Sequence, residues 1–341
     1  MYDLTDYDYD LPESLIAQYP AQPRDSCRLM VVDRATGTIR DAIFYELADL
    51  VQEGDRFIFN DTRVIPARLK GQRVGGGASE VFLLRPFSED IWEVIARPNK
   101  KLPAGAIVTF GQELSCEFLE GGTEGCRRAR FQSSLPLQEA FKKIGRVPLP
   151  PYIRGGVAEK RDEEDYQTIF ATQLGAIAAP TAGLHFSEGL LATCRAKGVS
   201  ESRVTLHVGL GTFKPVETRN IRDHQIHAES YFISPEAATQ LNTPVPGRSI
   251  CVGTTTCRTL EAASESTGKI QSGRGESRLF IYPGYQFRYV SSLLTNFHLP
   301  RSSLLMLVAA LMGYDLMREA YKKAIVDGYR FYSYGDAMLI I

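Results

Sequence analysis

The sequence predicts an α/β (α+β multidomain) protein: an α/β layered domain formed from both chain ends, with an inserted antiparallel β-barrel. First, 341 residues favour about two domains at roughly 150 residues each. Second, short β-like segments separated by glycine and proline fill residues 63–151, which is typical of a small sandwich or barrel. Third, strand-like and helix-like segments alternate over 152–341, which is typical of an α/β layer. The expected domains are therefore 1–62 with 152–341, and 63–151.

The first segment and the insert contribute short apolar strands. Residues 1–62 contain two candidate strands, 29–32 and 56–59. The insert contains four, separated by breakers such as the glycines at 75–77. These four candidates are 64–69, 80–84, 92–96 and 107–110. The prolines in 148–151 resist both helix and sheet pairing, so they predict a linker out of the insert.

The remainder of the chain predicts both helices and strands. Helices are expected over 187–197, 235–241, 302–313 and 316–327, and from about Cys257 onward. Strands are expected over 203–208, 249–252 and 279–282. Ser187 and Gly198 are suitable residues for the start and end of the first of these helices. The apolar run 304–312 is too short to cross a bilayer of about 30 Å, so it predicts a buried helix.

Charge is distributed unevenly along the chain. The formal net charge of −1 excludes a uniformly basic nucleic-acid-binding protein. Residues 1–60 carry 5 basic and 12 acidic side chains, whereas residues 97–161 carry 12 basic and 6 acidic ones. The basic stretch includes Arg127, Arg128, Lys142 and Lys143. Such residues could contact phosphates, or they could simply form a solvated face.

Cysteine spacing and the first residues indicate the compartment. The six cysteines show no C-x-x-C spacing, which gives no support to a zinc ribbon or a thioredoxin-like site. The acidic start of the chain lacks the apolar core of a signal peptide. Free thiols without an export signal favour the cytoplasm.

All five histidines follow residue 184 and lie in segments rich in glycine, threonine or proline. His185, His207 and His298 each occupy such a segment. We interpret these segments as loops at strand ends, where open α/β sheets bind ligands. A neutral histidine can move a proton at cell pH. The alternative is a structural histidine with satisfied hydrogen bonds, and it is the stronger reading for His207.

The segment containing His224, His227 and Glu229 offers potential metal ligands. It lacks the helical His-Glu-x-x-His spacing of zinc proteases, and Glu229 would leave the shared helix face. An acid–base or hydrogen-bonding role is favoured over a metal site, with a structural role as the remaining alternative. We expect no metal.

Several other polar segments are candidate binding sites. Thr254 and Thr255 follow a strand and open a helix, where backbone N–H groups suit a carboxylate or phosphate, although helix capping alone would explain them. Asn60, Asp61 and Arg63 could fix a polar ligand or cap a turn. The aromatic and arginine residues of 329–338 could stack on a base, but packing against the sheet is the commoner outcome.

Taken together, these segments resemble the S-adenosylmethionine:tRNA ribosyltransferase-isomerase family of queuosine biosynthesis over nearly the whole chain. No single segment is decisive, but their order is. The main ones are 6–12 (DYDYDLP), 59–68 (FNDTRVIPAR), 148–153 (PLPPYI), 179–186 (APTAGLHF), 205–213 (TLHVGLGTF), 224–229 (HQIHAE), 252–255 (VGTT), 282–285 (YPGY), 296–300 (NFHLP) and 333–338 (SYGDAM). Departures are local: Cys27 stands where serine is usual, and Ser187 where threonine is usual.

The resemblance implies an enzyme that transfers and isomerises the ribosyl unit of S-adenosylmethionine. The acceptor is 7-aminomethyl-7-deazaguanine at the wobble position of tRNA, and the products are epoxyqueuosine-tRNA, adenine and methionine. The implied partners are S-adenosylmethionine as cosubstrate and a tRNA anticodon stem-loop, with no membrane and no metal. The family fold is an α/β domain with an inserted β-barrel, and we expect a monomer.

The resemblance also suggests roles for individual residues. The expected acid–base residues are His224, His227 and Glu229, with His185 assisting. The expected substrate-binding residues are Asn60, Asp61, Arg63, Thr181, His207, Thr254, Thr255, His298 and Asp336. The expected tRNA-binding residues are Arg127, Arg128, Lys142 and Lys143. Two other functions stay open: a non-catalytic RNA-binding module, and a methyltransferase, which would need a glycine-rich loop after the strand 29–32.

Overall fold

The computed structural model describes residues 1–122, 126–209, 216–226, 228–264 and 266–341. The chain forms two compact units. The first comprises Met1–Thr62, Gln167–Gln173 and Ala179–Ile341, and the second comprises Arg63–Tyr166 and Leu174–Ala178. The second unit begins at the expected residue 63 but extends beyond 151. Whether residues 63–151 fold as a domain of their own stays a prediction.

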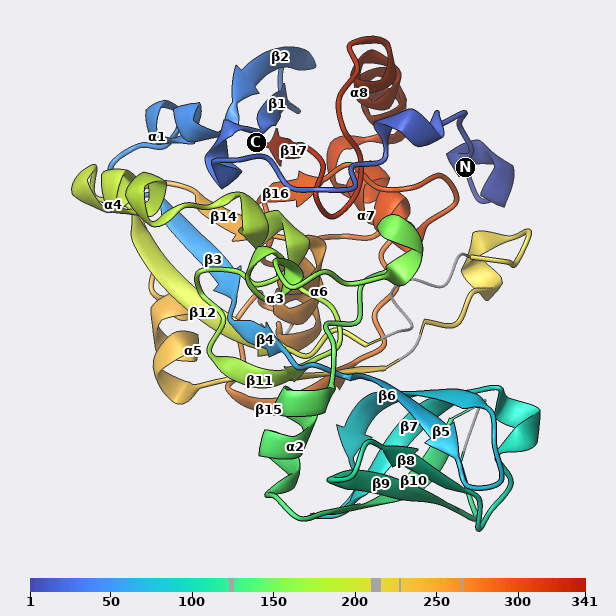
Figure 1. Ribbon diagram of the computed structural model, residues 1–341. Coiled ribbons are helices and arrows are strands. Elements are labelled where there is room, and N and C mark those ends of the chain that lie inside the picture. The colour runs from blue at the N-terminus through green and yellow to red at the C-terminus, as the bar shows by residue number, and fades with distance from the viewer. Residues whose placement is uncertain (123–125, 210–215, 227, 265) are drawn as a thin grey trace. The chain divides into compact units, whose positions relative to one another are not determined.

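A mixed sheet forms the centre of the first unit (Figure 1). Its described strands follow the order β15-β13-β12-β3-β14-β16-β17-β1-β2. Neighbours β12, β3, β14 and β16 are parallel to one another, whereas β13 and β17 run antiparallel to them. The bounds are β1 Arg28–Asp33, β2 Thr38–Ile43, β3 Arg56–Asn60, β12 Ser200–Leu206, β13 Glu229–Ile233, β14 Ser249–Val252, β15 Gly273–Ser277, β16 Ser292–Asn296 and β17 Ala337–Ile340.

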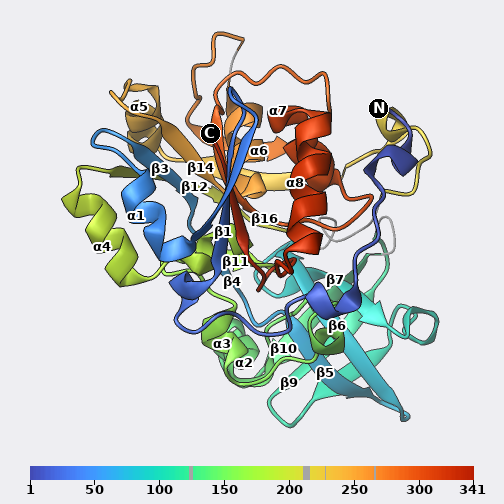
Figure 2. The same ribbon diagram turned by 90° about the horizontal axis from the view of Figure 1, so that it is seen from above.

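Helices cover both faces of this sheet, so its central strands are apolar on both sides. Alternate strand residues belong to two different cores: Ile58 packs in one, and its neighbours Phe57 and Phe59 pack in the other. Figure 2 shows α1 and α4 on one side of the sheet and α7 and α8 on the other. The helices of this unit are α1 Leu47–Leu50, α4 Glu188–Ala196, α5 Pro235–Asn242, α6 Thr254–Ala263, α7 Ser303–Met312 and α8 Tyr314–Val326.

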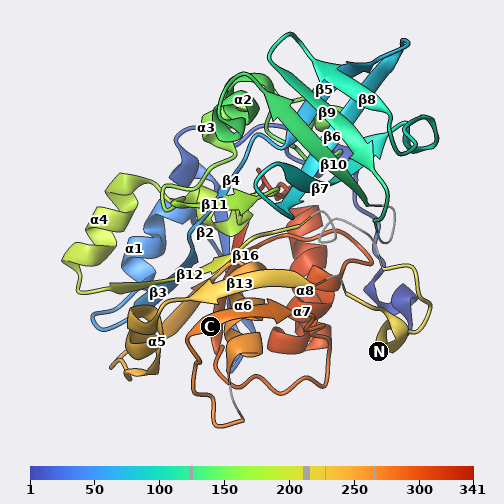
Figure 3. The same cartoon turned by 90° about the horizontal axis from the view of Figure 1, so that it is seen from below.

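The second unit contains a closed antiparallel barrel in the order β10-β7-β6-β5-β8-β9 (Figure 3). Its core side chains alternate along the strands, as Leu114, Cys116 and Phe118 do on β9. The elements are β5 Arg68–Arg73, β6 Ala78–Pro86, β7 Ile91–Arg97, β8 Ile107–Phe110, β9 Leu114–Leu119, β10 Arg127–Ser133, α2 Leu137–Ile144 and α3 Asp162–Asp165. A short ladder of β4 (Thr62–Val64) and β11 (Gln173–Ala176) lies where the two units join in sequence. The expected fold class, an α/β layer with an inserted antiparallel barrel, is confirmed.

Three expected elements differ from the structure. The single strand expected over 64–69 is two strands, β4 and β5, because Pro66 has no N–H to donate to a ladder. The strand expected over 279–282 is wrong: the Leu279 carbonyl accepts a bond from the Arg258 guanidinium instead, and Pro283 follows. The helix expected from about Cys257 begins earlier, at Thr254, so the threonines lie inside it.

Two further expectations for the first unit are confirmed. The Ser187 hydroxyl accepts from the Leu190 N–H at the start of α4, and Gly198 follows its end with φ +85°. The apolar run 304–312 lies in the buried helix α7.

All six cysteines are free. No helix in the described ranges has both the length and the apolar character needed to span a membrane.

Candidate active site

The parallel strands β12, β3, β14 and β16 end at the same edge of the sheet, which we call the carboxyl edge. Each strand delivers polar residues there. His207 follows β12, Asn60 ends β3, Thr254 follows β14, and Asn296 ends β16. The antiparallel strands β13 and β17 begin at this edge. Glu229 is the first residue of β13, and Asp336 directly precedes β17. The topology thus brings most of the expected site residues to one edge.

The Asn60 side chain connects the ends of β3 and β12 at the carboxyl edge. Backbone pairing between the two strands ends at Asn60 opposite Val204. The Asn60 amide then takes over: its Nδ2 donates to the Leu206 carbonyl at 3.0 Å, and its Oδ1 accepts from the Leu206 N–H at 3.0 Å. Oδ1 also accepts from the Thr62 N–H at 3.1 Å. A buried side chain that satisfies three backbone groups fixes both strand ends.

Asp61 and Thr62, the two residues after Asn60, are also held by side-chain hydrogen bonds. The buried Asp61 carboxylate accepts from the hydroxyls of Thr205 at 2.7 Å and Thr172 at 3.1 Å. The Thr62 hydroxyl lies 2.8 Å from His207 Nδ1. Partial burial lowers the pKa of His207, so its imidazole is neutral at cell pH. A neutral imidazole beside a carboxylate can accept or relay a proton.

The start of α6 is a second polar feature of the edge. Gly253 precedes the helix with φ +91° and ψ +148°, a backbone conformation that residues other than glycine rarely adopt. The Thr256 hydroxyl donates back to the Val252 carbonyl at 2.7 Å. The Thr255 hydroxyl lies 3.4 Å from the Asn60 amide nitrogen. The first N–H groups of this ten-residue helix can therefore serve an anionic group.

His185 is buried in a hydrogen-bonded cluster beside β16. It ends the short 3-10 helix η7 (Thr181–His185). The Asn296 Nδ2 lies 2.9 Å from His185 Nε2 and also donates to the Tyr332 carbonyl at 3.2 Å, while Thr181 donates to Asn296 Oδ1. Because Asn296 donates through Nδ2, His185 Nε2 is the acceptor and Nδ1 carries the proton, 3.3 Å from Cys27 Sγ.

Burial holds both internal histidines in the neutral form. Desolvation, reinforced by Arg330 and Arg24, lowers the pKa of His185 to about 3. Desolvation alone lowers the pKa of His298 to about 3. His298 Nε2 lies 2.8 Å from the Thr295 hydroxyl, and its backbone N–H donates to Tyr321. These contacts make the two histidines part of the frame of the site.

Asp336 links the last strand to the first. Its carboxylate accepts from the backbone N–H groups of Arg28 at 3.0 Å and Arg330 at 2.7 Å. The Arg330 guanidinium lies 3.5 Å from it. Asp336 is buried, so its oxygens serve the backbone at the edge.

Glu229 forms a buried ion pair with Arg258 of α6. The Glu229 Oε2 to Arg258 Nη1 distance is 2.5 Å, and both side chains are at most 5% exposed. Glu229 Oε1 also accepts from the Gly209 N–H at 3.3 Å. The His224 ring lies edge-on to Phe280 at 5.2 Å between centroids, and His227 lies outside the described residues. Within the described ranges, no group of three or more His, Cys, Asp or Glu is placed to hold a metal ion.

The remaining expected residues belong to the second unit. Arg63 is its exposed first residue. Arg128 on β10 lies over the ring of Phe87 at 4.0 Å, and Arg127 donates to Asn99 at 2.7 Å. Lys142 and Lys143 are exposed at the end of α2, with Lys143 paired to Glu113 at 2.6 Å. The structure thus places two of these charges on a strand and two on a helix.

Asn296 and Arg258 make contacts at the site that the sequence did not single out individually. Asn296 lay within a recognised segment, but its bond to His185 joins residues 111 positions apart. Arg258 was visible as the first charge after the threonine run, which is a weak signal for its pairing with Glu229.

Comparison with known proteins covers the whole chain. Residues 4–340 match the family model described as queuosine biosynthesis protein. A protein of Symbiobacterium thermophilum named S-adenosylmethionine:tRNA ribosyltransferase-isomerase is 48% identical over 342 residues, 99% of each chain. A Gloeobacter violaceus protein of the same name is 48% identical over 99% of this chain and 96% of its own.

A solved structure gives the same result. The crystal structure of an S-adenosylmethionine tRNA ribosyltransferase from Thermotoga maritima superimposes with a TM-score of 0.54. It is 35% identical in sequence, and the match covers 98% of this chain and all of the other. With a family model matched from end to end and relatives of almost equal length, the chain belongs to the queuosine biosynthesis protein family, whose curated members carry the name S-adenosylmethionine:tRNA ribosyltransferase-isomerase.

Proposed function

We propose that this chain is an S-adenosylmethionine:tRNA ribosyltransferase-isomerase that acts in the cytoplasm. It transfers and isomerises the ribosyl unit of S-adenosylmethionine onto the aminomethyl nitrogen of 7-aminomethyl-7-deazaguanine at the tRNA wobble position. Epoxyqueuosine-tRNA forms, and adenine and methionine leave. The observation that carries the proposal is the family match over residues 4–340, together with the gathering of the family segments at the carboxyl edge.

S-adenosylmethionine carries a carboxylate at one end and a nucleoside at the other. The N-terminus of α6 suits the methionine carboxylate, because its free N–H groups point to the carboxyl edge and the helix dipole favours an anion. His207 is half-buried near Asp61 and neutral, so it suits the ribose hydroxyls as a hydrogen-bonding group. The hydrogen bonds of Asn60 with Thr255, and of Asp61 with Thr205, hold the start of α6 and the end of β12 in position.

The reaction needs one base and one acid. Protons on carbon next to the sulfonium are acidified by the positive sulfur, so a base can begin the reaction there. Adenine leaves when a donor protonates one of its nitrogens, and methionine leaves as a neutral thioether. We propose that Glu229 and His224 act next to the reacting ribose. His227 joins them in the proposal because it lies between them in the sequence. Arg258 orients Glu229 through their ion pair.

His185 is a positioning residue in this proposal. Both its ring nitrogens are engaged, by Asn296 and Cys27, and its pKa of about 3 keeps it neutral. It therefore fixes η7 against the end of β16 instead of exchanging protons. The donor for adenine must come from another group at the edge.

Product analysis tests the proposed function directly. The chain is incubated with S-adenosylmethionine and tRNA bearing the aminomethyl-deazaguanine, and the small products are separated by chromatography. We expect adenine and methionine in equal amounts, each matching the tRNA modified. A methyltransferase would release S-adenosylhomocysteine, and a non-catalytic RNA-binding module would release nothing.

A further inference from the structure

An open hollow of about 930 Å³ lies on the first unit, beside the loop between β15 and β16. Its walls include five aromatic side chains and two guanidinium groups. These are Tyr2, Phe280, Tyr282, Tyr285, Phe287, Arg222 and Arg288. Among the lining residues that the structure describes, none is acidic. The volume is near the upper end for a site that encloses one drug-sized ligand, and the hollow is open to solvent.

We propose that this hollow receives unpaired nucleotides of the tRNA anticodon loop, with their bases stacked on the aromatic walls and their phosphates next to the two arginines. The inference rests on the proposed function and adds a location for RNA on the first unit. Unpaired bases are recognised by stacking on aromatic and arginine planes, and a cationic rim attracts the backbone.

The aromatic residues of the wall contact one another at an angle and are not stacked face to face. Tyr2 and Tyr282 lie T-shaped at 6.2 Å between centroids, and Phe280 lies 5.2 Å from Tyr282. Tyr2 is 41% exposed, and the Arg222 guanidinium lies 4.7 Å from its ring centre. The Arg222 guanidinium is thus stacked over the Tyr2 ring, and a base entering the hollow would extend this stack.

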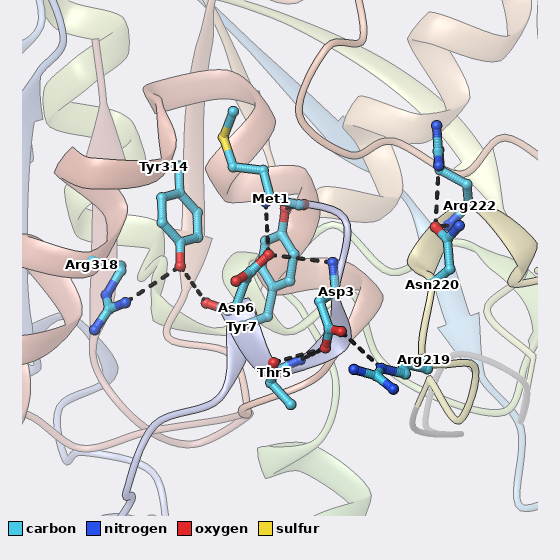
Figure 4. A network of polar contacts seen from close by, with 10 residues as sticks. All are labelled: Met1, Asp3, Thr5, Asp6, Tyr7, Arg219, Asn220, Arg222, Tyr314 and Arg318. Carbon is cyan, nitrogen blue, oxygen red and sulfur yellow. Dashed lines mark hydrogen bonds and ion pairs between the residues drawn. The ribbon is translucent and has the colours of Figure 1, made fainter.

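The two arginines keep their positive charge available. The Arg222 guanidinium donates to Asn220 at 3.3 Å, and the Arg288 guanidinium donates to the Ser264 carbonyl at 3.2 Å. Among the described residues, neither guanidinium forms an ion pair with a carboxylate. Figure 4 shows why the nearby acids do not neutralise Arg222. Asp3 pairs with Arg219 at 3.0 Å, and Asp6 pairs with the amino terminus at 2.8 Å.

One buried carboxylate fixes the wall in advance. Glu261 accepts four hydrogen bonds, from the Tyr285 hydroxyl and from the backbone N–H groups of Arg288, Tyr289 and Val290, at 2.8–3.0 Å. The loop therefore needs no ordering when a ligand binds, which lowers the entropic cost.

The same loop is joined to the carboxyl edge. Phe280 follows Leu279, whose carbonyl accepts from Arg258, and Arg258 pairs with Glu229. S-adenosylmethionine itself is a poor occupant of the hollow, because its sulfonium and ammonium are positive and would face two guanidinium groups, while none of the described lining residues is acidic. The phosphates of single-stranded RNA fit these charges, and in the proposal a base further along the same RNA reaches the carboxyl edge.

The first test removes the two charges. Arg222→Gln with Arg288→Gln is compared with a control pair that removes two exposed arginines elsewhere on the first unit, Arg40→Gln with Arg318→Gln. Binding of a fluorescein-labelled anticodon stem-loop RNA is followed by anisotropy across a salt series, and S-adenosylmethionine binding by calorimetry. We expect at least tenfold weaker RNA binding and a salt slope lower by roughly 1.4 for two lost phosphate contacts, with unchanged S-adenosylmethionine affinity.

The second test addresses stacking and does not depend on the first. Tyr2→Ala should weaken RNA binding at least fivefold, whereas Tyr2→Phe should retain it, because only the ring is needed. RNA affinity within twofold of the control pair, or a loss confined to S-adenosylmethionine, would overturn the inference. Adenine release by the unaltered chain is measured alongside. Its absence would refute the proposed function, whereas its presence with normal RNA binding by the variants would refute this inference alone.

Discussion

His185 and His298 show what burial does to a single residue at this site. Each has a pKa lowered to about 3, so the folded chain keeps both neutral, whereas the unfolded chain protonates them below about pH 6.5. Their contribution to the free energy of unfolding is therefore fully present above pH 6.5. It is lost progressively as the pH falls from 6.5 toward 3, by up to about 1.4 kcal/mol per pH unit for each histidine.

This linkage gives a prediction for stability. The free energy of unfolding, measured by urea denaturation between pH 4.5 and 7.5, should rise with pH more steeply in the unaltered chain than in His185→Gln with His298→Gln. Carboxyl groups titrate in both proteins, so the difference in slope isolates the histidines. Equal slopes would show that the two imidazoles become protonated in the folded chain.

At the residue scale the sequence predicted the position of the site better than the roles within it. It placed Asn60, Asp61, His207 and Thr255 at or near strand ends, and the structure brings these strand ends to one edge. It could not predict that Asn60 replaces a stretch of sheet pairing, because the Leu206 backbone lies 146 positions away. The neutral state of His185 depends on burial by distant segments, and local sequence carries no signal for that.

The turn from β14 into α6 is the element on which cosubstrate binding depends in this account. Gly253→Ala forces a side chain into a backbone conformation that costs about 1–3 kcal/mol, and relief of this strain would move the first N–H groups of the helix. We expect a lower free energy of unfolding by denaturation and weaker S-adenosylmethionine binding by calorimetry.

A matched glycine controls for the added methyl group. Gly189 is exposed within α4, and a Cβ there would meet only the Ser187 hydroxyl at 3.9 Å. Gly189→Ala should raise the free energy of unfolding by about 0.5–1 kcal/mol and leave cosubstrate binding unchanged. If Gly253→Ala behaved like this control, the helix start would not be strained as described.

The barrel strand β10 and the helix α2 carry the charges expected to meet tRNA. Replacing Arg127, Arg128, Lys142 and Lys143 together with glutamine should weaken tRNA binding and flatten its salt dependence. The effect should be smaller than four full charges imply, because Lys143 already pairs with Glu113. Filter binding across a salt series measures this, and an unchanged slope would remove these four residues from the interface.

Helices with clear capping signals and strands with a continuous apolar run were predictable, whereas strand β16 was not. Ser187 and Ser302 cap helices whose limits the sequence indicated to within about two residues. Strand β16 was missed, because its sequence has only two apolar residues, and its buried Ser292, Thr295 and Asn296 interrupt the pattern expected of a central strand. The segment 279–282 resembled a strand, but its backbone is held by Arg258, a contact outside any local window.

For the whole molecule, the pattern of segments predicted the architecture that the structure has. Both chain ends contribute to one sheet, where β1 pairs in parallel with β17, and the barrel is inserted between them. The net charge of −1 hid an acidic first segment and a basic stretch in the insert. The charges that matter for RNA in this account are few and local: the four residues of the insert, and Arg222 and Arg288 beside the aromatic hollow.

The central claim is that S-adenosylmethionine gives up its ribose and not its methyl group. The most direct test uses two preparations of S-adenosylmethionine, labelled with ¹⁴C in the ribose or in the methyl group. Each is incubated with the chain and with tRNA carrying 7-aminomethyl-7-deazaguanine, and the label in precipitated RNA is counted. We predict that ribose label enters the RNA in a one-to-one ratio with modified tRNA, while methyl label stays in free methionine. Methyl label in the RNA, with ribose label left in solution, would contradict the account.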